Sequence, residues 1–327
     1  MKKLINDIAN VLDESLDGFA AAHADLVTMD PGRRFVQRRT PAQAKVALVS
    51  GGGSGHEPLH AGFVGRGMLD AAVPGAIFTS PTPDRILAAI EAADTGAGVV
   101  LIVKNYEGDV MNFEMAAEMT EGEVARVLVD DDVAVDNSSY TIGRRGVAGT
   151  LVVEKILGAA AEKGMALPDL VALGARVNAA TRSMGVALSS CTVPAAGIPT
   201  FQLGEDEIEV GVGIHGEPGR RRAPMASADA IVAELLKAIL DDLKPEAGRK
   251  CLLFVNGFGG TPSGELYLVF NAARKRLEAE GLSVARSLVG SFVTSLEMAG
   301  CSLTVTVLDD ELTALWDEPV STPALRW

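Results

Sequence analysis

Short, uninterrupted apolar runs recur along the first half of the chain, and each one ends at glycine or charged residues. Residues 46–49 lead into a glycine-rich segment, residues 99–103 lead into a lysine, and residues 124–129 lead into three aspartates. Runs of Val, Leu and Ile without alternation are typical of strands that are buried on both faces, as in a parallel sheet covered by helices. We therefore predict a mainly parallel sheet in this part of the chain.

The stretches between these runs have the spacing of amphipathic helices. Pro83 is expected to begin one helix, because proline is well suited to the first helical position. Residues 112–121 and 150–162 predict two more helices, and Gly164 is a suitable C-cap for the second of them. Alternation of strands and helices in this order favours a parallel α/β sheet.

The pattern changes after about residue 185. Residues 205–212 alternate between acidic and apolar side chains, which is typical of a strand with one face in solvent. Ser227 is the expected N-cap of a helix whose apolar side chains continue at helical spacing to Leu243. Two further strands are predicted at residues 251–255 and 303–308.

These patterns together predict two α/β domains. The first, residues 1–185, is expected to have a mainly parallel sheet covered by helices. The second, residues 186–327, is expected to have a mixed sheet, because its strand pattern is less uniform.

The charge balance argues against two kinds of partner. The 327 residues include 29 Lys and Arg against 43 Asp and Glu, which gives a formal net charge of −14. Binding to nucleic acid or to an anionic membrane surface requires a basic face. We therefore expect neither nucleic acid nor membrane as a partner.

The location of the protein is inferred from what the sequence lacks. No apolar run approaches the roughly 20 residues of a membrane-spanning helix, and the acidic residues near the start do not fit a signal peptide. Three widely spaced cysteines fit neither a disulfide framework nor a close-spaced zinc motif. We expect a cytoplasmic protein without a bound metal.

Residues 50–58, Ser-Gly-Gly-Gly-Ser-Gly-His-Glu-Pro, directly follow the first predicted strand. Glycines permit positive φ angles and let backbone amides approach a small polar ligand. The Lys-Ser/Thr pair of a phosphate-binding P-loop is missing after the last glycine. The segment also does not fit a dinucleotide fingerprint, because His56 and Glu57 stand where small helix-entry residues belong. We predict a site for a small polar ligand at this edge of the sheet.

A second candidate segment, from Lys104 to Asp109, follows the next strand run. In α/β sheets the carboxyl ends of the strands are where ligands bind. A carboxylate there accepts a proton from a hydroxyl group, and an ammonium holds an oxygen atom. The alternative is a solvated Lys–Asp pair that caps a helix.

A third segment, Gly-Ile-His-Gly-Glu-Pro-Gly, contains His215 and echoes the sequence around His56. Neutral imidazole is both a base and a nucleophile near pH 7. We expect these two histidines to come from the two domains and to face one cleft. His23 and His60 are interpreted as structural.

The acidic run Asp130, Asp131 and Asp132 is interpreted as a solvated strand end. It has the oxygen ligands that Mg²⁺ prefers, but no phosphate-binding element accompanies it. No cluster of His, Cys and acidic residues has the spacing of metal ligands.

With these three segments assembled, the sequence resembles the substrate-binding K subunit of phosphoenolpyruvate-dependent dihydroxyacetone kinases. The resemblance extends over nearly the whole chain in order, and the matching segments are long enough to be specific. Besides the three segments above, the matching residues are 77–84, 130–135, 143–148, 191–197 and 315–317.

The resemblance implies a role for each site residue. The histidine at the position of His215 adds to the ketone carbon of dihydroxyacetone and forms a covalent hemiaminal. Lys104 and Asp109 bind the substrate, as do the backbone groups of the glycine segment, Gly53, Ser54 and Gly55. His56 is implied as a hydrogen-bonding and acid–base residue near the hydroxyl that accepts the phosphate.

Physical chemistry refines two of these roles. Addition of His215 to a carbonyl requires the free-base imidazole, so we expect Glu217 or a backbone carbonyl to fix its tautomer. We expect Asp109 to be the general base on the substrate hydroxyl, with His56 orienting that hydroxyl or sharing its proton.

The resemblance also implies partners. The phosphate would come from a separate L subunit that holds ADP with Mg²⁺, which an M subunit of the sugar phosphotransferase system recharges, and this chain would bind no cofactor itself. The K subunits of the family are homodimers, so we expect a homodimer. Two alternatives stay open: a non-catalytic paralogue that senses dihydroxyacetone and acts on a transcription regulator, and a kinase subunit for a four-carbon ketose such as erythrulose.

Overall fold

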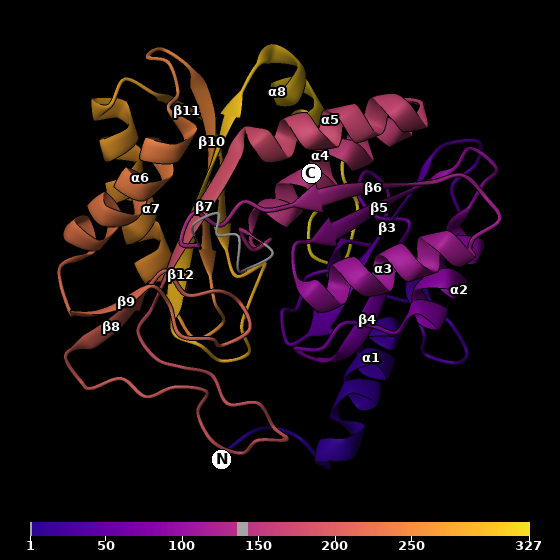
Figure 1. Cartoon of the computed structure of the whole chain (residues 1–327), viewed down its shortest axis with the longest axis horizontal. Coiled ribbons are helices and arrows are strands. Elements are labelled where there is room, and N and C mark those ends of the chain that lie inside the picture. Colours follow the sequence, from indigo (N-terminus) through magenta and orange to yellow (C-terminus); the bar gives the residue numbers. More distant parts are fainter. Residues whose placement is uncertain (1, 136–142) are drawn as a thin grey trace. The chain divides into compact units, whose positions relative to one another are not determined.

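Residues 2–135 and 143–327 are described in a computed structural model (Figure 1). They form two units, each assembled from separate segments of the chain. Unit 1 comprises residues 1–129, 150–176 and 314–327, and unit 2 comprises residues 130–149 and 177–313. The predicted join at residue 185 lies inside β7 (Thr181–Ala187), which pairs with strands of unit 2. The domain boundary at that residue stays a prediction.

The sheet of unit 1 has the strand order β1-β2-β4-β3-β5-β6. Strands β4, β3, β5 and β6 are parallel to one another, and β1 and β2 extend one edge in antiparallel fashion. The predicted mainly parallel sheet is therefore confirmed. Its strands are β1 (Val27–Met29), β2 (Val36–Arg38), β3 (Ala47–Ser54), β4 (Ala71–Ile77), β5 (Val99–Lys104) and β6 (Val124–Val129).

Helices cover both faces of this sheet. On one face, Ile90 of α2 and Phe113 of α3 share a buried core with Val49, Leu101 and Val103. The side chains of neighbouring strand residues point to the opposite face. On that face β6 packs closely against α5, because a Cβ added to Gly174 of α5 would lie 2.6 Å from the side chain of Val127. The helices that lie wholly or mostly in unit 1 are α1 (Val11–Ala22), α2 (Pro83–Ala93), α3 (Glu107–Met119), α4 (Gly149–Glu162) and α5 (Leu167–Ala179).

Unit 2 contains the predicted mixed sheet, with the order β11-β10-β12-β7-β8-β9. Strands β10 and β11 are parallel, and the other neighbours are antiparallel. The strands of this sheet not yet given are β8 (Glu207–Val210), β9 (Arg221–Pro224), β10 (Lys250–Gly257), β11 (Ser283–Gly290) and β12 (Gly300–Leu308). The remaining helices are α6 (Ala228–Leu243), α7 (Ser263–Ala279) and α8 (Asp310–Asp317).

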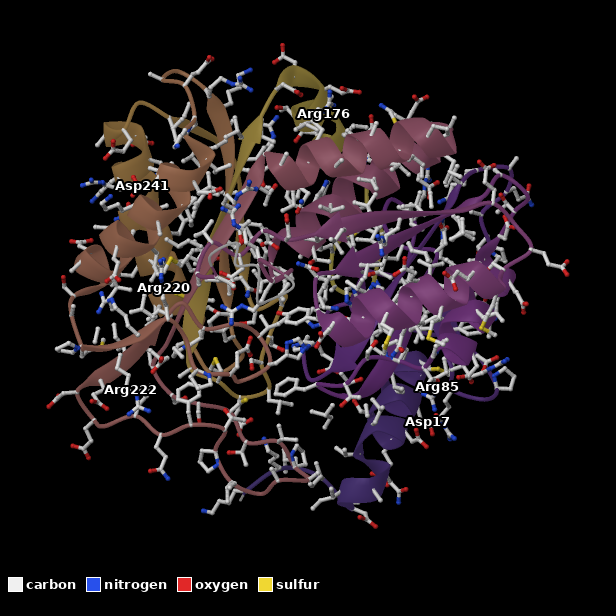
Figure 2. The ribbon with its side chains drawn as sticks, viewed as in Figure 1. Asp17, Arg85, Arg176, Arg220, Arg222 and Asp241 are labelled. Carbon is white, nitrogen blue, oxygen red and sulfur yellow. The ribbon has the colours of Figure 1, made fainter. Side chains whose placement is uncertain are left out.

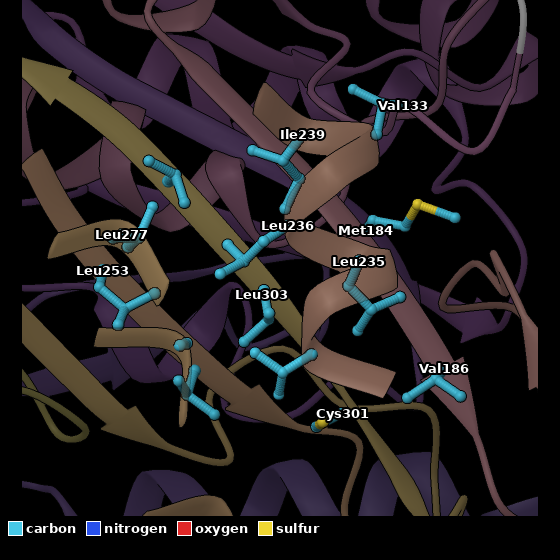
Figure 3. Packing of buried hydrophobic residues seen from close by; sticks show 14 of the residues in the cluster. Val133, Met184, Val186, Leu235, Leu236, Ile239, Leu253, Leu277, Cys301 and Leu303 are labelled. Atoms are coloured by element: carbon cyan, nitrogen blue, oxygen red, sulfur yellow. The ribbon is translucent and has the colours of Figure 1, made fainter. Parts of the chain in front are cut away.

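The core of unit 2 lies between this sheet and helix α6 (Figure 3). Leu235 and Ile239 of α6 pack with Leu253 of β10 and Leu303 of β12. Ser227 is the N-cap of α6, as predicted, and its hydroxyl accepts a hydrogen bond from the third residue after it at 3.3 Å. This packing fixes the strands of unit 2.

Charged side chains occupy the outside of each unit (Figure 2). Asp17 and Arg85 project from the helices of unit 1, and Arg222 and Asp241 project from unit 2. In the part of the chain that the structure describes, no helix has both the length and the apolar character needed to cross a membrane.

Candidate functional site

Three of the four glycines of the predicted loop, Gly51, Gly52 and Gly53, lie in the second half of β3 and pair with β4. The sequence placed them after the strand, but the ladder continues through them. A Cβ on Gly53 would lie 2.6 Å from the amide nitrogen of Thr79, and a Cβ on Gly52 would lie 2.2 Å from Nζ of Lys104. Any larger residue at Gly52 would displace the ammonium, so glycine lets the backbone approach this lysine directly.

Lys104 and Asp109 form a buried ion pair at the carboxyl end of β5. The ammonium of Lys104 donates to the carbonyl oxygen of Gly51 at 3.0 Å and lies 3.4 Å from Oδ2 of Asp109. Both side chains are at least 95% buried, which excludes the solvated helix-capping pair. Asp109 lies in the first turn of α3, which begins at Glu107 rather than at the predicted residue 112. The N-terminus of a helix stabilises its negative charge.

The imidazole of His60 and the carboxyl group of Glu154 lie next to Lys104 in the interior of unit 1. Nε2 of His60 lies 2.9 Å from Nζ of Lys104, and Nδ1 of His60 lies 2.5 Å from Oε1 of Glu154 on α4. Burial, followed by the charge of Lys104, holds the pKa of His60 well below its usual range, so this imidazole is neutral. His60 thus contacts a predicted site residue, which the sequence had not indicated.

His56 is completely buried and stacks on the ring of Phe78, with ring centroids 5.1 Å apart and planes inclined by 20°. The hydroxyl of Ser54 donates to the carbonyl oxygen of Gly75 at 2.7 Å. The amide of Gly55 donates to the carboxylate of Glu57 at 3.0 Å. These contacts hold the glycine segment in place, and the substrate contacts predicted for Ser54 and Gly55 stay predictions.

A cavity of about 460 Å³ in unit 1 borders the glycine segment. Gly52, Gly53 and Ser54 form one wall, and residues 57–62 form another. Leu12, Leu16 and Phe19 of α1 close it on the far side. The glycine strand therefore has open space beside it, with mostly apolar walls.

In unit 2, His215 lies in the connection between β8 and β9, and a salt-bridge chain holds this connection. Oε2 of Glu217 accepts a hydrogen bond from the backbone amide of His215 at 2.9 Å. Arg145 donates to Oε1 of Glu217 at 2.8 Å and to the carbonyl oxygen of Gly211 at 2.8 Å. The same guanidinium pairs with Asp132 at 2.7 Å. Glu217 thus binds the backbone of the histidine, and the expectation that Glu217 or a backbone carbonyl fixes the tautomer of its ring stays a prediction.

The acidic run that follows β6 is not a solvated strand end, because Asp131 and Asp132 are almost completely buried. Asp131 accepts hydrogen bonds from the amides of Val147 and Gly149 and from the hydroxyl of Ser183, so it caps the start of α4. Burial raises the pKa of Asp132 to about 6, against the opposing charge of Arg145. Within residues 2–135 and 143–327, no group of His, Cys, Asp and Glu is arranged to hold a metal ion.

The predicted site residues therefore fall into two groups. Unit 1 brings together the glycine strand, Lys104 and Asp109, and it also contains His56. Unit 2 contains His215 with the residues that hold its backbone. A single cleft that includes both groups stays a prediction. The residues that the sequence analysis did not connect with the site are His60, Arg145 and Glu154.

In this α/β protein a buried lysine thus lies against a glycine strand, with a carboxylate at the start of the following helix, and the small polar ligand predicted for this edge of the sheet stays a prediction. The Dak1 domain matches residues 17–324 of this sequence. The chain belongs to the Dak1 domain family, and the family resemblance found in the sequence is thereby confirmed.

Two relatives match nearly from end to end. The dihydroxyacetone-binding subunit DhaK of the PTS-dependent dihydroxyacetone kinase 1 of Listeria innocua is 52% identical, over 95% of each chain. The corresponding subunit of the PEP-dependent dihydroxyacetone kinase of Escherichia coli strain K12 is 47% identical, over all of this chain and 99% of that one. These relatives are subunits of kinases.

Two solved structures have the same fold. The dihydroxyacetone kinase operon co-activator Dha-DhaQ superposes with a TM-score of 0.91 and 35% identity, over 98% of each chain. The dihydroxyacetone kinase of C. freundii in complex with AMP-PNP and Mg²⁺ gives a TM-score of 0.88 and 36% identity, over 98% of this chain and 60% of that one.

Proposed function

We propose that this chain is the dihydroxyacetone-binding subunit of a dihydroxyacetone kinase that depends on the phosphotransferase system. It captures the ketose on His215 and presents a hydroxyl group for phosphoryl transfer from a partner subunit, giving dihydroxyacetone phosphate. The observation that carries the proposal is the buried pair of Lys104 and Asp109 against Gly52, in a chain with near full-length similarity to such subunits.

Capture begins with the lone pair of the neutral imidazole of His215. A ring nitrogen forms a bond to the carbonyl carbon and the π bond of the carbonyl breaks. The oxygen takes up a proton while the other ring nitrogen gives one up, which yields the neutral hemiaminal. The bond fixes the terminal hydroxyl in place and removes part of the entropic barrier to transfer. Glycerol has the same hydroxyls but no carbonyl, so it is rejected at this step.

The residues of unit 1 act on the hydroxyl that accepts the phosphate. Asp109 takes the hydroxyl proton, and the ammonium of Lys104 holds a substrate oxygen and balances the charge of the carboxylate. Backbone groups of Gly53, Ser54 and Gly55 bind the substrate, and His56 orients the hydroxyl or shares its proton. Phosphoryl transfer needs mainly alignment and charge stabilisation, which fixed, buried groups supply.

The phosphate reaches the substrate from outside this chain. We propose an L subunit that carries ADP with Mg²⁺ and an M subunit that recharges it, with this chain acting as a homodimer. The C. freundii kinase supports this division, because a structure of that longer chain holds AMP-PNP and Mg²⁺ while this chain covers 60% of it.

The decisive experiment combines capture with turnover. Intact-protein mass spectrometry after incubation with dihydroxyacetone is expected to show one added triose on the wild-type chain and none on His215→Ala. Addition of the L and M subunits with phosphoenolpyruvate is expected to yield dihydroxyacetone phosphate. An unchanged adduct on His215→Ala would assign the nucleophile to another residue.

The second candidate function is a sensor that binds dihydroxyacetone and acts on a transcription regulator. It is favoured by the similarity to the co-activator Dha-DhaQ, with a TM-score of 0.91. Capture of the triose without any turnover in the reconstituted system would support the sensor. A four-carbon ketose such as erythrulose is the alternative substrate, and the ratio of kcat/KM for the two ketoses decides between them.

A further inference from the structure

The side chains of His60, Glu154 and Ser50 form a cluster of polar contacts next to Lys104 in the interior of unit 1. Nδ1 of His60 lies 2.5 Å from Oε1 of Glu154 and 3.1 Å from the hydroxyl of Ser50. Nε2 on the opposite side of the ring lies 2.9 Å from Nζ of Lys104. All four side chains are buried, and Glu154 and Lys104 are completely so.

The stability of the fold does not explain this carboxyl group. Glu154 lies in α4 among the apolar residues Val152, Val153, Ile156 and Leu157, all completely buried. Burial raises the pKa of Glu154 to about 8 in spite of the nearby charge of Lys104. A buried ionisable group is often no more stabilising than an apolar residue of similar size, so a role at the site is the better account.

Counting donors fixes the positions of the protons. The ammonium of Lys104 has N–H groups and no lone pair, so Nε2 of His60, 2.9 Å away, can only accept a hydrogen bond from it. Nε2 therefore carries a lone pair, and the single proton of the neutral ring is on Nδ1, facing Glu154.

Ser50 leads to the same tautomer. Its hydroxyl donates to the carbonyl oxygen of Ile102 at 2.7 Å, so it presents a lone pair to the ring of His60. Nδ1 thus faces two acceptors, Ser50 and Glu154. The other tautomer would aim an N–H at the ammonium of Lys104, 2.9 Å away, and two donors cannot share a hydrogen bond.

We infer that Glu154 is a positioning residue for Lys104 that acts through His60. It holds the imidazole in the Nδ1–H tautomer, and the free Nε2 then accepts a hydrogen bond from Lys104, which directs the ammonium toward Gly51 and Asp109. This inference rests on the proposed function, which gives Lys104 and Asp109 their roles on the substrate.

Three variants test the inference. Glu154→Leu removes the acceptor, whereas Glu154→Gln keeps an oxygen that accepts the Nδ1 proton. Glu162→Leu is the matched control, because it lies on the same helix but pairs with Arg38, at 2.7 Å, outside this chain of residues. Glu154→Leu is expected to lower kcat/KM by about 10- to 100-fold, the usual effect of losing a group that orients a functional residue. Glu154→Gln and Glu162→Leu are expected to stay near the wild-type value.

NMR of isotope-labelled histidine gives a second result that does not depend on turnover. His60 is expected to show the Nδ1–H tautomer in the wild type and in Glu154→Gln. In Glu154→Leu only Ser50 is left to accept from Nδ1, so the Nε2–H tautomer is expected to become populated. An Nε2–H tautomer in the wild type would overturn the inference, and this result does not depend on how well a variant folds. An unchanged tautomer in a folded Glu154→Leu variant would overturn it as well.

The two measurements also separate this inference from the proposed function. If the wild-type chain fails to phosphorylate dihydroxyacetone while the tautomers behave as expected, the proposed substrate is wrong and the link from Glu154 through His60 to Lys104 stands. If the wild type turns over and Glu154→Leu matches it, Glu154 has no positioning role.

Discussion

Glu217 holds His215 through the backbone: Oε2 accepts the amide of the histidine at 2.9 Å. The other oxygen of this carboxylate accepts from Arg145 at 2.8 Å. The nucleophile proposed for capture therefore lies in a connection whose backbone is fixed by a charged network. This arrangement favours a preorganised nucleophile, because capture needs the imidazole within a narrow range of positions.

Loss of the Glu217 carboxylate is expected to slow capture. In Glu217→Leu the amide of His215 loses its acceptor, and the rate of hemiaminal formation is expected to fall by roughly 10-fold or more. Glu217→Gln keeps an amide oxygen and is expected to retain most of the rate. Glu207→Leu is the control, because its carboxylate accepts from Gly204 instead. Time-resolved mass spectrometry of the adduct measures the effect, and equal rates in all variants would contradict it.

Gly52→Ala is expected to damage turnover more than stability. The new Cβ would lie 2.2 Å from Nζ of Lys104 and 3.3 Å from Oδ2 of Asp109, so the lysine must move. We expect kcat to fall at least ~10-fold and the free energy of unfolding to fall by about 1–3 kcal/mol, as for other overpacked sites.

The control for this change is Gly18→Ala in α1, where a Cβ meets nothing within 4 Å. Alanine has the higher helix propensity, so this variant is expected to be as stable as the wild type or slightly more so. Steady-state kinetics and urea unfolding of both variants check the pair. Wild-type turnover in Gly52→Ala would show that the position of Lys104 is not critical.

The sequence predicted several strands and the candidate residues at their ends because both depend on local patterns. Continuous apolar runs identified β3, β5 and β6, and their carboxyl ends directed attention to Lys104 and Asp109. The ends of parallel strands meet at one edge of a sheet, so closeness of these groups follows from topology alone.

Contacts between distant segments were not predictable in this way. His60 and Glu154 are separated by 94 residues, and their contact depends on how α4 packs on the sheet. Asp131 was interpreted as solvated. Its carboxylate instead accepts hydrogen bonds from the amides of residues that lie 16 and 18 positions later in the chain, and the sequence does not indicate these contacts. Buried polar groups of this kind follow no periodic pattern, so only the tertiary structure reveals them.

The buried Glu154 is expected to make stability fall as pH rises. Its carboxyl group titrates near 4.5 when unfolded and at about 8 when folded. Below pH 4.5 both states hold the proton and there is no cost. Between these values the folded state keeps a proton that the unfolded state has lost, so the free energy of unfolding declines by about 1.4 kcal/mol per pH unit.

Glu154→Gln removes this titration. Relative to the variant, the wild type is expected to lose on the order of 4 kcal/mol between pH 4.5 and 8, with the full cost present above pH 8. Urea unfolding of both proteins at intervals across this range measures the difference. Parallel curves would show that the carboxyl group of Glu154 titrates normally in the folded protein.

Asp109→Asn is expected to separate capture from transfer. The amide keeps the shape of the side chain but cannot take the hydroxyl proton, so turnover is expected to fall at least ~10²-fold while the adduct on His215 still forms. Glu107→Gln is the matched control, because this exposed carboxylate lies in the same first turn of α3. Mass spectrometry follows the adduct, and phosphoenolpyruvate-coupled assays follow turnover. Near-normal turnover of Asp109→Asn would assign the general base to His56, which is buried against Phe78.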